Sequence, residues 1–313
     1  MPHADWHILG PGAIGSLFAW HLAEAGSSVR LLTRHPGESA RLITLDDHTA
    51  SPHTSATRAF HVDHQDDTPI RRLLVTVKAH QTTAALESIR HRIDSRSLIL
   101  FLQNGMGTWD CAKTLFPATR WLVGTTTEGA WRAADRHIVH AGRGETWIGS
   151  LNPAWTNDAE QLVDTLKNTR FHPGHDAQIL QRLWRKLAVN CAINPLTVLF
   201  DCRNGELLQK PAALRQMEAV CVEVERVMGA ALGGVTVEPL FPLVRTVAEK
   251  TGANHSSMLQ DYRRGQPTEI EFITGYLVAE GRRLGIDTPE NAGILDAIRG
   301  LNPHWSGTDC TLP

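Results

Sequence analysis

The sequence has few of the features that mark secreted, membrane-spanning or nucleic-acid-binding proteins. Its 313 residues include only five cysteines, which are widely spaced and form no Cys-x-x-Cys pair, so we expect reduced thiols rather than a disulfide framework. No apolar run reaches the roughly 18 residues that a membrane-spanning helix needs. Lys and Arg number 31 against 33 Asp and Glu, and without a basic excess nucleic-acid binding is disfavoured. The N-terminus has no basic segment, so no cleaved secretory signal is expected.

The chain does have the balance of a globular protein. Apolar residues make up 42% and charged residues 20%, which is enough apolar material for a sizeable core. At roughly 150 residues per domain, the length allows one large domain or two ordinary ones. Histidines number 16, but none is joined to a cysteine or a second histidine at the spacing of a zinc site. We therefore expect no metal site, and solvated or hydrogen-bonded histidines instead.

The first half of the chain alternates apolar runs with helical stretches. Trp6–Leu9 and Val29–Leu32 are predicted as strands on either side of a glycine turn and a helix. Leu73–Val77 and Leu98–Leu102 are continuous apolar runs, which are typical of strands buried on both faces of a parallel sheet. The stretch 120–148 has β-forming residues and glycines without a helix-length segment. It is predicted to add antiparallel strands at one edge of the sheet.

The second half changes to helical periodicity after about Ala177. The helices predicted there are Ile179–Phe200, Pro211–Leu232, Pro239–Lys250, Ser256–Arg264, Ile270–Leu284 and Thr288–Ile298. Alternating strands and helices followed by helices alone indicate two domains. We predict an α/β domain over residues 1–177 and an all-helical domain over residues 178–313, because Pro-Gly punctuates the chain near the boundary.

A glycine-rich loop follows the first predicted strand. It has the pattern G-x-G-x-x-G and consists of Gly10, Pro11, Gly12, Ala13, Ile14 and Gly15. In a dinucleotide-binding loop the first glycine makes the tight turn, the second admits the pyrophosphate, and the third allows helix and strand to pack. The helix N-terminus adds unpaired N–H groups and a positive dipole. The flanking strand and helix favour a dinucleotide site over a merely structural turn.

The end of the second strand indicates which dinucleotide is bound. NAD-specific sites usually carry a carboxylate there for the ribose 2′-hydroxyl. This strand ends Leu31-Leu32-Thr33-Arg34-His35, without a carboxylate. A guanidinium suits the geometry of a 2′-phosphate, so Arg34 predicts NADP(H), unless it is simply a solvated arginine at a strand end.

Two further polar groups follow predicted strands in the first half. Lys78 comes after Leu73–Val77, and Asn104 comes after Leu98–Leu102. Ligands of open α/β sheets bind outside the carboxyl ends of the strands, which makes both residues site candidates. Asn104-Gly105 is also an ordinary turn signal, so turn chemistry alone could account for it.

One polar stripe stands out in the helical half. Lys186, Asn190 and Asn194 are spaced i, i+4 and i+8, which places them on one face of a helix otherwise rich in apolar residues. Asparagine is a poor helix former and costly to bury without partners. Pro195 removes a helical hydrogen bond and frees a carbonyl beside the asparagines. The pattern indicates a site, with a solvent-facing polar stripe as the alternative.

A second polar cluster lies farther along the chain. It comprises Ser256–Asp261 and Pro267–Glu271. Ser256 and Thr268 also suit the N-caps of the helices that follow them, so local capping is the alternative to a role in a site.

These segments together resemble the ketopantoate reductase (2-dehydropantoate 2-reductase) family, from Gly10 to about Ile298. The matching segments, in family order, are Gly10–Gly15, Val77–Ala79, Gln103–Gly107, Lys186–Asn190 with Asn194–Thr197, Ser256–Asp261 and Thr268–Ile270. The resemblance implies a Rossmann-type domain, an all-α domain like the C-terminal domain of 6-phosphogluconate dehydrogenase, and a site in the cleft between them. It also implies NADPH-dependent reduction of ketopantoate to (R)-pantoate, a cytoplasmic step toward pantothenate and coenzyme A.

The resemblance also implies roles for individual residues of the helical half. Lys186 matches the family's catalytic lysine, and Glu269 matches the acidic residue that works with the lysine and the substrate. Asn190 and Asn194 match the asparagines that hold the substrate's hydroxyl end, and Ser257 matches the serine that meets its carboxylate. Whether Glu269 acts on the lysine or on the substrate hydroxyl stays open at this stage.

Two further residues match the family near the nicotinamide, and one segment departs from the family pattern. Lys78 and Asn104 match residues that border the nicotinamide and the substrate, and Glu269 is grouped with them as a cofactor contact. The family often continues Thr-Glu-Ile with Asp-Tyr-Ile-Asn-Gly, where this chain has residues 271–275 as Glu-Phe-Ile-Thr-Gly.

Two other functions share the same scaffold. One is the reduction of a different branched 2-keto acid, which the asparagine pair disfavours because a site built to bond a hydroxyl rejects an analogue without one. The other is a non-catalytic NADPH sensor, which could dispense with Lys186 and Glu269. If the chain is a reductase, of ketopantoate or of another 2-keto acid, its expected partner is a small 2-keto acid, and no nucleic acid or membrane is expected. The chain could be a monomer or a homodimer.

Overall fold

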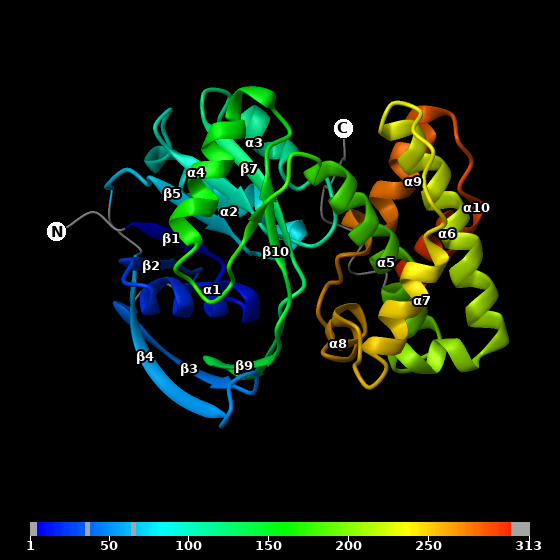
Figure 1. The fold of residues 1–313 in the computed structure, drawn as a ribbon, viewed down its shortest axis with the longest axis horizontal. Coiled ribbons are helices and arrows are strands. Elements are labelled where there is room, and N and C mark those ends of the chain that lie inside the picture. Colours follow the sequence, from blue (N-terminus) through cyan, green and yellow to red (C-terminus); the bar gives the residue numbers. More distant parts are fainter. Residues whose placement is uncertain (1–4, 35–37, 64–66, 302–313) are drawn as a thin grey trace. The chain divides into compact units, whose positions relative to one another are not determined.

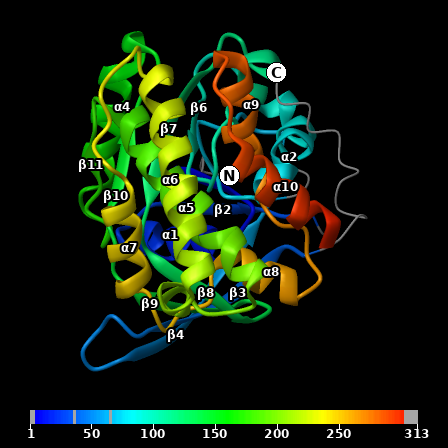
Figure 2. The same cartoon turned by 90° about the vertical axis from the view of Figure 1, so that its right-hand side faces the viewer.

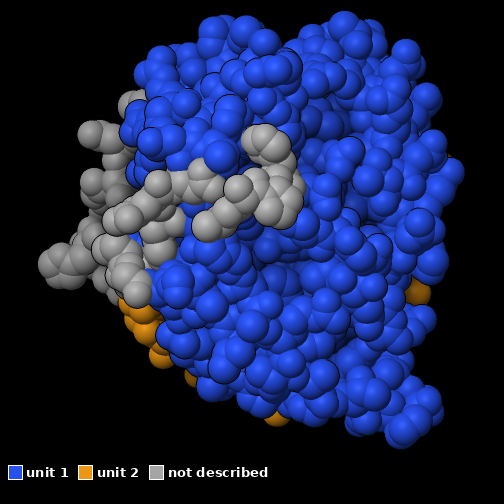
Figure 3. Space-filling view, turned by 90° about the vertical axis from the view of Figure 1, so that its left-hand side faces the viewer, with its two compact units in different colours: residues 1–103, 108–180 blue, residues 104–107, 181–313 orange. Residues whose placement is uncertain are grey.

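The computed structural model describes residues 5–34, 38–63 and 67–301, and the chain divides into two compact units. The α/β unit comprises residues 1–103 and 108–180, and the helical unit comprises residues 104–107 and 181–313 (Figure 3). The tail after Leu301, with Cys310, lies outside the described residues, as do His35 and His64.

The α/β unit is built on one 11-stranded sheet in the order β11-β10-β7-β6-β5-β1-β2-β4-β3-β9-β8 (Figure 1). Its strands are β1 (Trp6–Leu9), β2 (Val29–Leu32), β3 (Ala40–Asp47), β4 (Thr54–Val62), β5 (Arg72–Val75), β6 (Leu98–Phe101), β7 (Arg120–Thr126), β8 (Gly129–Ala134), β9 (His137–Gly142), β10 (Thr146–Gly149) and β11 (Gly174–His175). Strands β7, β6, β5, β1 and β2 are parallel to one another. Most of their residues are apolar, which suits strands covered on both faces.

The helices of this unit are α1 (Ala13–Glu24), α2 (Thr82–Ser88), α3 (Asp110–Leu115) and α4 (Thr156–Leu166). Strands from both parts of the sheet contact α1, including β1, β2, β3, β8 and β9. Residues of α1 and α4 share one apolar core with the sheet, in which Phe18 stacks on Phe171 with ring centroids 3.9 Å apart. The sheet therefore wraps around α1 (Figure 1). Its last strand, β8, contacts that helix.

The prediction that residues 120–148 add antiparallel strands at one edge is right for the β8–β9 hairpin and wrong for the stretch as a whole. β7 is parallel to β6, β10 pairs antiparallel with β7, and the β8–β9 hairpin joins the other end of the sheet. The reason is an antiparallel hairpin, β3–β4, that the sequence did not predict. This hairpin extends the sheet beyond β2 and offers β3 as a parallel partner to β9.

The helical unit contains six α-helices within the described residues: α5 (Ile179–Leu199, which starts in the α/β unit), α6 (Pro211–Ala231), α7 (Phe241–Lys250), α8 (Ser257–Arg263), α9 (Thr274–Leu284) and α10 (Pro289–Leu301). Helices α6, α9 and α10 pack on one another (Figure 2). Helix α5 runs through Pro195 without a break. The prediction of an α/β Rossmann-type domain followed by an all-helical domain is confirmed.

The single helix predicted over Ile270–Leu284 is wrong. A 3-10 turn, η5 (Ile270–Phe272), precedes α9, and Ile273 between them has a non-helical φ of −103° and ψ of −88°. In a continuous helix the Phe272 carbonyl would accept from the amide of Tyr276. Here it accepts a hydrogen bond of 2.9 Å from the backbone N–H of Met106.

Three features of the described residues bear on function. No helix among them is long and apolar enough to cross a membrane. No cluster of three or more His, Cys, Asp or Glu side chains in these residues is arranged to hold a metal ion. The four cysteines that the structure describes are free thiols.

Candidate active site

The glycine-rich loop turns sharply between β1 and α1. Gly10 has a φ of +87°, a conformation that glycine adopts without strain. Its carbonyl accepts a hydrogen bond of 2.7 Å from the N–H of Gly12 and one of 2.8 Å from the Thr76 hydroxyl. Helix α1 then begins at Ala13, with Gly12 as a residue that has no side chain to cap it. The first-turn N–H groups are left for a ligand that accepts hydrogen bonds.

The space around the three glycines fits a dinucleotide. A Cβ on Gly10 would lie 2.4 Å from Val77, and one on Gly15 would lie 2.4 Å from the Thr76 hydroxyl, so neither position admits a side chain. A Cβ on Gly12 would meet nothing closer than Arg132 Nη2 at 3.9 Å. The first and third glycines therefore serve tight packing, while the second leaves an open face for a phosphate.

Arg34 and Lys78 both follow strands of the parallel sheet. Arg34 is exposed and comes two residues after the end of β2. Lys78 is half-buried and immediately precedes the 3-10 turn η1 (Ala79–Gln81). Because β1 lies between β2 and β5 and all three are parallel, both cations belong to the carboxyl edge of the sheet.

Gln103 is a residue to which sequence reasoning gave no role. It directly precedes Asn104, and its side-chain amide donates hydrogen bonds of 2.7 Å to the Val77 carbonyl and to the Thr82 hydroxyl. It thereby joins the chain after β6 to the chain after β5, next to Lys78. A glutamine at the end of a predicted strand is the only signal in the sequence, and it does not reveal these partners.

Asn104 begins a four-residue loop that belongs to the helical unit. Gly105 has a φ of +80°, and a Cβ there would lie 2.5 Å from the Phe272 carbonyl oxygen. Met106 donates its backbone N–H to that same carbonyl. The structure therefore places the loop that starts at Asn104 against the turn that follows Glu269, whereas Lys78 belongs to the α/β unit.

Lys186, Asn190 and Asn194 lie along one face of α5, as their spacing predicts. Lys186 and Asn190 are half-buried, and Asn194 is 9% exposed. Helix α5 is held to α9 by Trp184 and Tyr276, whose ring centroids are 5.9 Å apart. The polar face is therefore part of a packed region, and the alternative of a freely solvated stripe does not apply to Asn194.

Lys186 has an altered acidity. Burial lowers the pKa of its ammonium from the usual 10.5 to about 8, because the charged form loses hydration. The negative charge of Glu269, which is only 6% exposed, acts in the opposite direction and raises the pKa of the lysine. A lysine with a pKa of about 8 is largely protonated at neutral pH and still able to release its proton.

The two serines of the second polar cluster are arranged differently from one another. Ser256 is buried and caps α8, because its hydroxyl accepts from the Leu259 N–H at 3.0 Å. The same hydroxyl lies 2.6 Å from that of Thr197, which donates to the Asn194 carbonyl at 2.7 Å. Ser257 is exposed at the first position of α8. The capping alternative thus holds for Ser256 and leaves Ser257 available to a ligand.

Comparison with protein-family models identifies the family of this chain. Residues 6–153 match the model of the ketopantoate reductase PanE/ApbA family, and residues 178–302 match the model of its C-terminal domain. The chain belongs to the ketopantoate reductase family. The family predicted from the sequence motifs is therefore confirmed.

Individual relatives agree with this assignment. The 2-dehydropantoate 2-reductase of Vibrio cholerae is 38% identical over 304 residues, which cover 96% of this chain and 98% of that protein. The structure of a probable 2-dehydropantoate 2-reductase from Bacillus subtilis is 28% identical, covers 95% of this chain and 99% of its own, and has a TM-score of 0.78. The structure of D-mandelate dehydrogenase with NADH and anilino(oxo)acetate has a TM-score of 0.85 at 21% identity, with 96% and 99% coverage, and shares the fold.

Proposed function

We propose that this chain is an NADPH-dependent 2-dehydropantoate 2-reductase, which reduces ketopantoate to (R)-pantoate in the cytoplasmic synthesis of pantothenate and coenzyme A. The relatives of similar length that bear this name support the reaction. The observation that carries the proposal is the polar face of α5, where Lys186, with a pKa of about 8, lies in line with two asparagines. We assign cofactor binding to residues 1–177 and the catalytic and substrate groups to residues 178–313.

Lys186 acts as the general acid in this proposal. The bound nicotinamide supplies a hydride to the C2 carbonyl of the keto acid. Negative charge then builds on the carbonyl oxygen, and the ammonium of Lys186 stabilises it and transfers a proton to it. The products are a 2-hydroxy acid and a neutral lysine, which regains its proton from solvent.

Glu269 keeps Lys186 in its charged form. Its carboxylate raises the pKa of the lysine against the effect of burial, and this favours an action on the lysine over an action on the substrate hydroxyl. Asn190 and Asn194 bind the hydroxyl end of ketopantoate, and Ser257 meets its carboxylate. Asn104 and Lys78 border the substrate and the nicotinamide.

NADPH is the proposed cofactor, held by the loop Gly10–Gly15 and by Arg34. The support is the exposed guanidinium of Arg34, two residues after the end of β2, and the absence of a carboxylate in the sequence from Leu31 to His35. The fold neighbour D-mandelate dehydrogenase was solved with NADH, so the fold alone does not select NADPH. The choice between them therefore rests on Arg34.

Substrate comparison tests the function against its closest alternative, a reductase of another branched 2-keto acid. The purified protein is assayed with NADPH and either ketopantoate or 2-ketoisovalerate, which lacks the hydroxyl. We expect kcat/KM for ketopantoate to be higher by on the order of 100-fold or more, because site asparagines left without their hydroxyl partner penalise the analogue. Equal values would favour the alternative, and tight NADPH binding without turnover of any 2-keto acid would favour a sensor.

A further inference from the structure

The side chain of Arg132 reaches the phosphate loop from the last strand of the sheet. Its Nη2 donates a hydrogen bond of 3.4 Å to the carbonyl oxygen of Pro11, a residue 121 positions earlier in the chain. The same nitrogen is the nearest described atom on the open face of Gly12, at 3.9 Å from the position of a Cβ. A permanent positive charge therefore lies beside the position at which the second glycine of the loop admits a phosphate.

The course of β8 explains this approach. β8 ends the sheet and contacts α1, the helix that begins at the phosphate loop. Arg132 pairs with Ile138 of β9, which is 1% exposed, and the register shifts directly after this pair. Irregularities of this kind re-aim side chains at the ends of sheets. Arg132 itself is exposed, so its guanidinium is accessible to a ligand.

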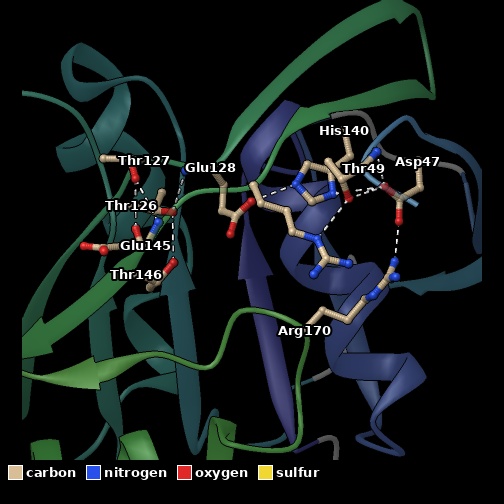
Figure 4. A network of polar contacts seen from close by, with 10 residues as sticks. Asp47, Thr49, Thr126, Thr127, Glu128, His140, Glu145, Thr146 and Arg170 are labelled. Atoms are coloured by element: carbon tan, nitrogen blue, oxygen red, sulfur yellow. Dashed lines mark hydrogen bonds and ion pairs between the residues drawn. The ribbon is translucent and has the colours of Figure 1, made fainter. Parts of the chain in front are cut away.

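A buried polar network fixes the start of β8 (Figure 4). Glu128, the residue before the strand, lies with its Oε2 2.7 Å from His140 Nε2 of β9, and its N–H donates to the Thr126 hydroxyl at 3.1 Å. His140 Nδ1 lies 3.6 Å from Asp47 of β3, which also pairs with Arg170. The segment that leads into β8 is thus anchored to His140 of β9 and, through it, to Asp47 of β3.

The contact with Pro11 leaves most of the guanidinium unused. A neutral carbonyl at 3.4 Å is a long and weak acceptor for one N–H, and arginine has several more donors in a planar fork. Within residues 5–34, 38–63 and 67–301, no carboxylate forms an ion pair with Arg132. Phosphate oxygens match the fork in both charge and geometry.

We propose that Arg132 is a further cofactor-binding residue, which pairs with the pyrophosphate of the bound nicotinamide dinucleotide. The inference rests on the proposed dinucleotide site. It assigns a different phosphate group to each of two arginines. Arg34 follows β2 and recognises the 2′-phosphate, which only NADPH carries. Arg132 lies at the glycine loop and recognises the pyrophosphate, which NADPH and NADH share.

Direct binding measurements distinguish these roles without catalysis. Dissociation constants for NADPH, NADH, ADP and adenosine 2′-monophosphate are measured by calorimetry for the wild type and for Arg132→Gln, Arg132→Lys and Arg34→Gln. ADP has the pyrophosphate without the 2′-phosphate, and adenosine 2′-monophosphate has the reverse. Arg143→Gln is the matched control, because Arg143 is also exposed and its bond of 3.4 Å goes to the Thr49 hydroxyl. Thermal unfolding verifies that each variant is folded.

For Arg132→Gln we expect binding of NADPH, NADH and ADP to weaken by similar factors, on the order of tenfold, because one charge-assisted pair is lost. Binding of adenosine 2′-monophosphate should stay unchanged, and Arg132→Lys should restore part of the loss, since it keeps the charge without the fork. Wild-type affinity of Arg132→Gln for all four ligands would overturn the inference. So would a loss confined to NADPH and adenosine 2′-monophosphate, which would place Arg132 at the 2′-phosphate. A wild-type protein that binds neither dinucleotide would overturn the proposed function as well.

Discussion

Glu269 and Lys186 are coupled electrostatically inside the helical unit, although 83 positions of sequence separate them. Burial alone drives the pKa of the lysine downward, and the carboxylate limits that fall, so that the pKa is about 8. A general acid works best when its pKa lies near the operating pH. The pair therefore gives the lysine an acidity that suits proton transfer to a substrate alkoxide.

The first prediction concerns the pH dependence of catalysis. The acid form of Lys186 is present below its pKa, so kcat with saturating ketopantoate and NADPH should fall as the pH rises through about 8. Glu269→Gln removes the group that raises this pKa and should move the descending limb to lower pH. The measurement is kcat across pH 6 to 10 for both proteins, at roughly half-unit steps. An identical descending limb in the variant would contradict the coupling.

A second prediction concerns the lysine itself. Lys186→Ala should lower kcat by on the order of 100-fold or more, since proton donation by a positioned acid contributes about that much. The dissociation constant for NADPH should change little, because the lysine acts on the carbonyl oxygen of the substrate rather than on the dinucleotide. Lys250→Ala, on the exposed end of α7, serves as the control and should keep normal turnover. Near-normal kcat in Lys186→Ala would remove this residue from the acid role.

A third prediction concerns the choice of dinucleotide. Arg34→Ala should raise KM for NADPH much more than KM for NADH, because only NADPH carries the 2′-phosphate that suits a guanidinium. Steady-state kinetics with both cofactors at saturating ketopantoate give the two ratios. Equal increases for the two cofactors would show that Arg34 does not read the 2′-phosphate.

A fourth prediction concerns the packing of the phosphate loop. A Cβ at position 15 would lie 2.4 Å from the Thr76 hydroxyl and 2.5 Å from the Gly10 carbonyl. Gly15→Ala should therefore lower the free energy of unfolding by about 1–3 kcal/mol and weaken dinucleotide binding. Gly142→Ala is the control, because nothing lies within 4 Å of a Cβ there, and it should leave both unchanged. Urea unfolding measures the first effect, and a variant as stable as the wild type would refute the packing argument.

Local patterns in the sequence predicted part of this structure well. Continuous apolar runs located β1 and β2 with their observed bounds, and helical spacing placed Lys186 and the two asparagines on one face of α5. The β3–β4 hairpin was missed because β4 has mostly exposed residues over Thr54–His61 in place of a buried apolar run. A pattern method has no period to detect there.

Other features depend on partners that are distant in the sequence. The break before α9 arises because Met106 occupies the Phe272 carbonyl, and nothing in residues 270–284 indicates it. Arg132 reaches Pro11 only because β8 ends the sheet against α1. The acidity of Lys186 likewise follows from burial and from Glu269, which a linear sequence does not display.

The oxidation of NADPH in the presence of ketopantoate tests the central claim most directly. The purified wild-type protein is supplied with ketopantoate and NADPH, and pantoate is quantified beside the NADPH consumed, with NADH and 2-ketoisovalerate as controls. The account predicts one pantoate formed for each NADPH oxidised. The reaction should be much slower when NADH replaces NADPH or when 2-ketoisovalerate replaces ketopantoate. The absence of ketopantoate-dependent NADPH oxidation in a folded, NADPH-binding protein would contradict the account.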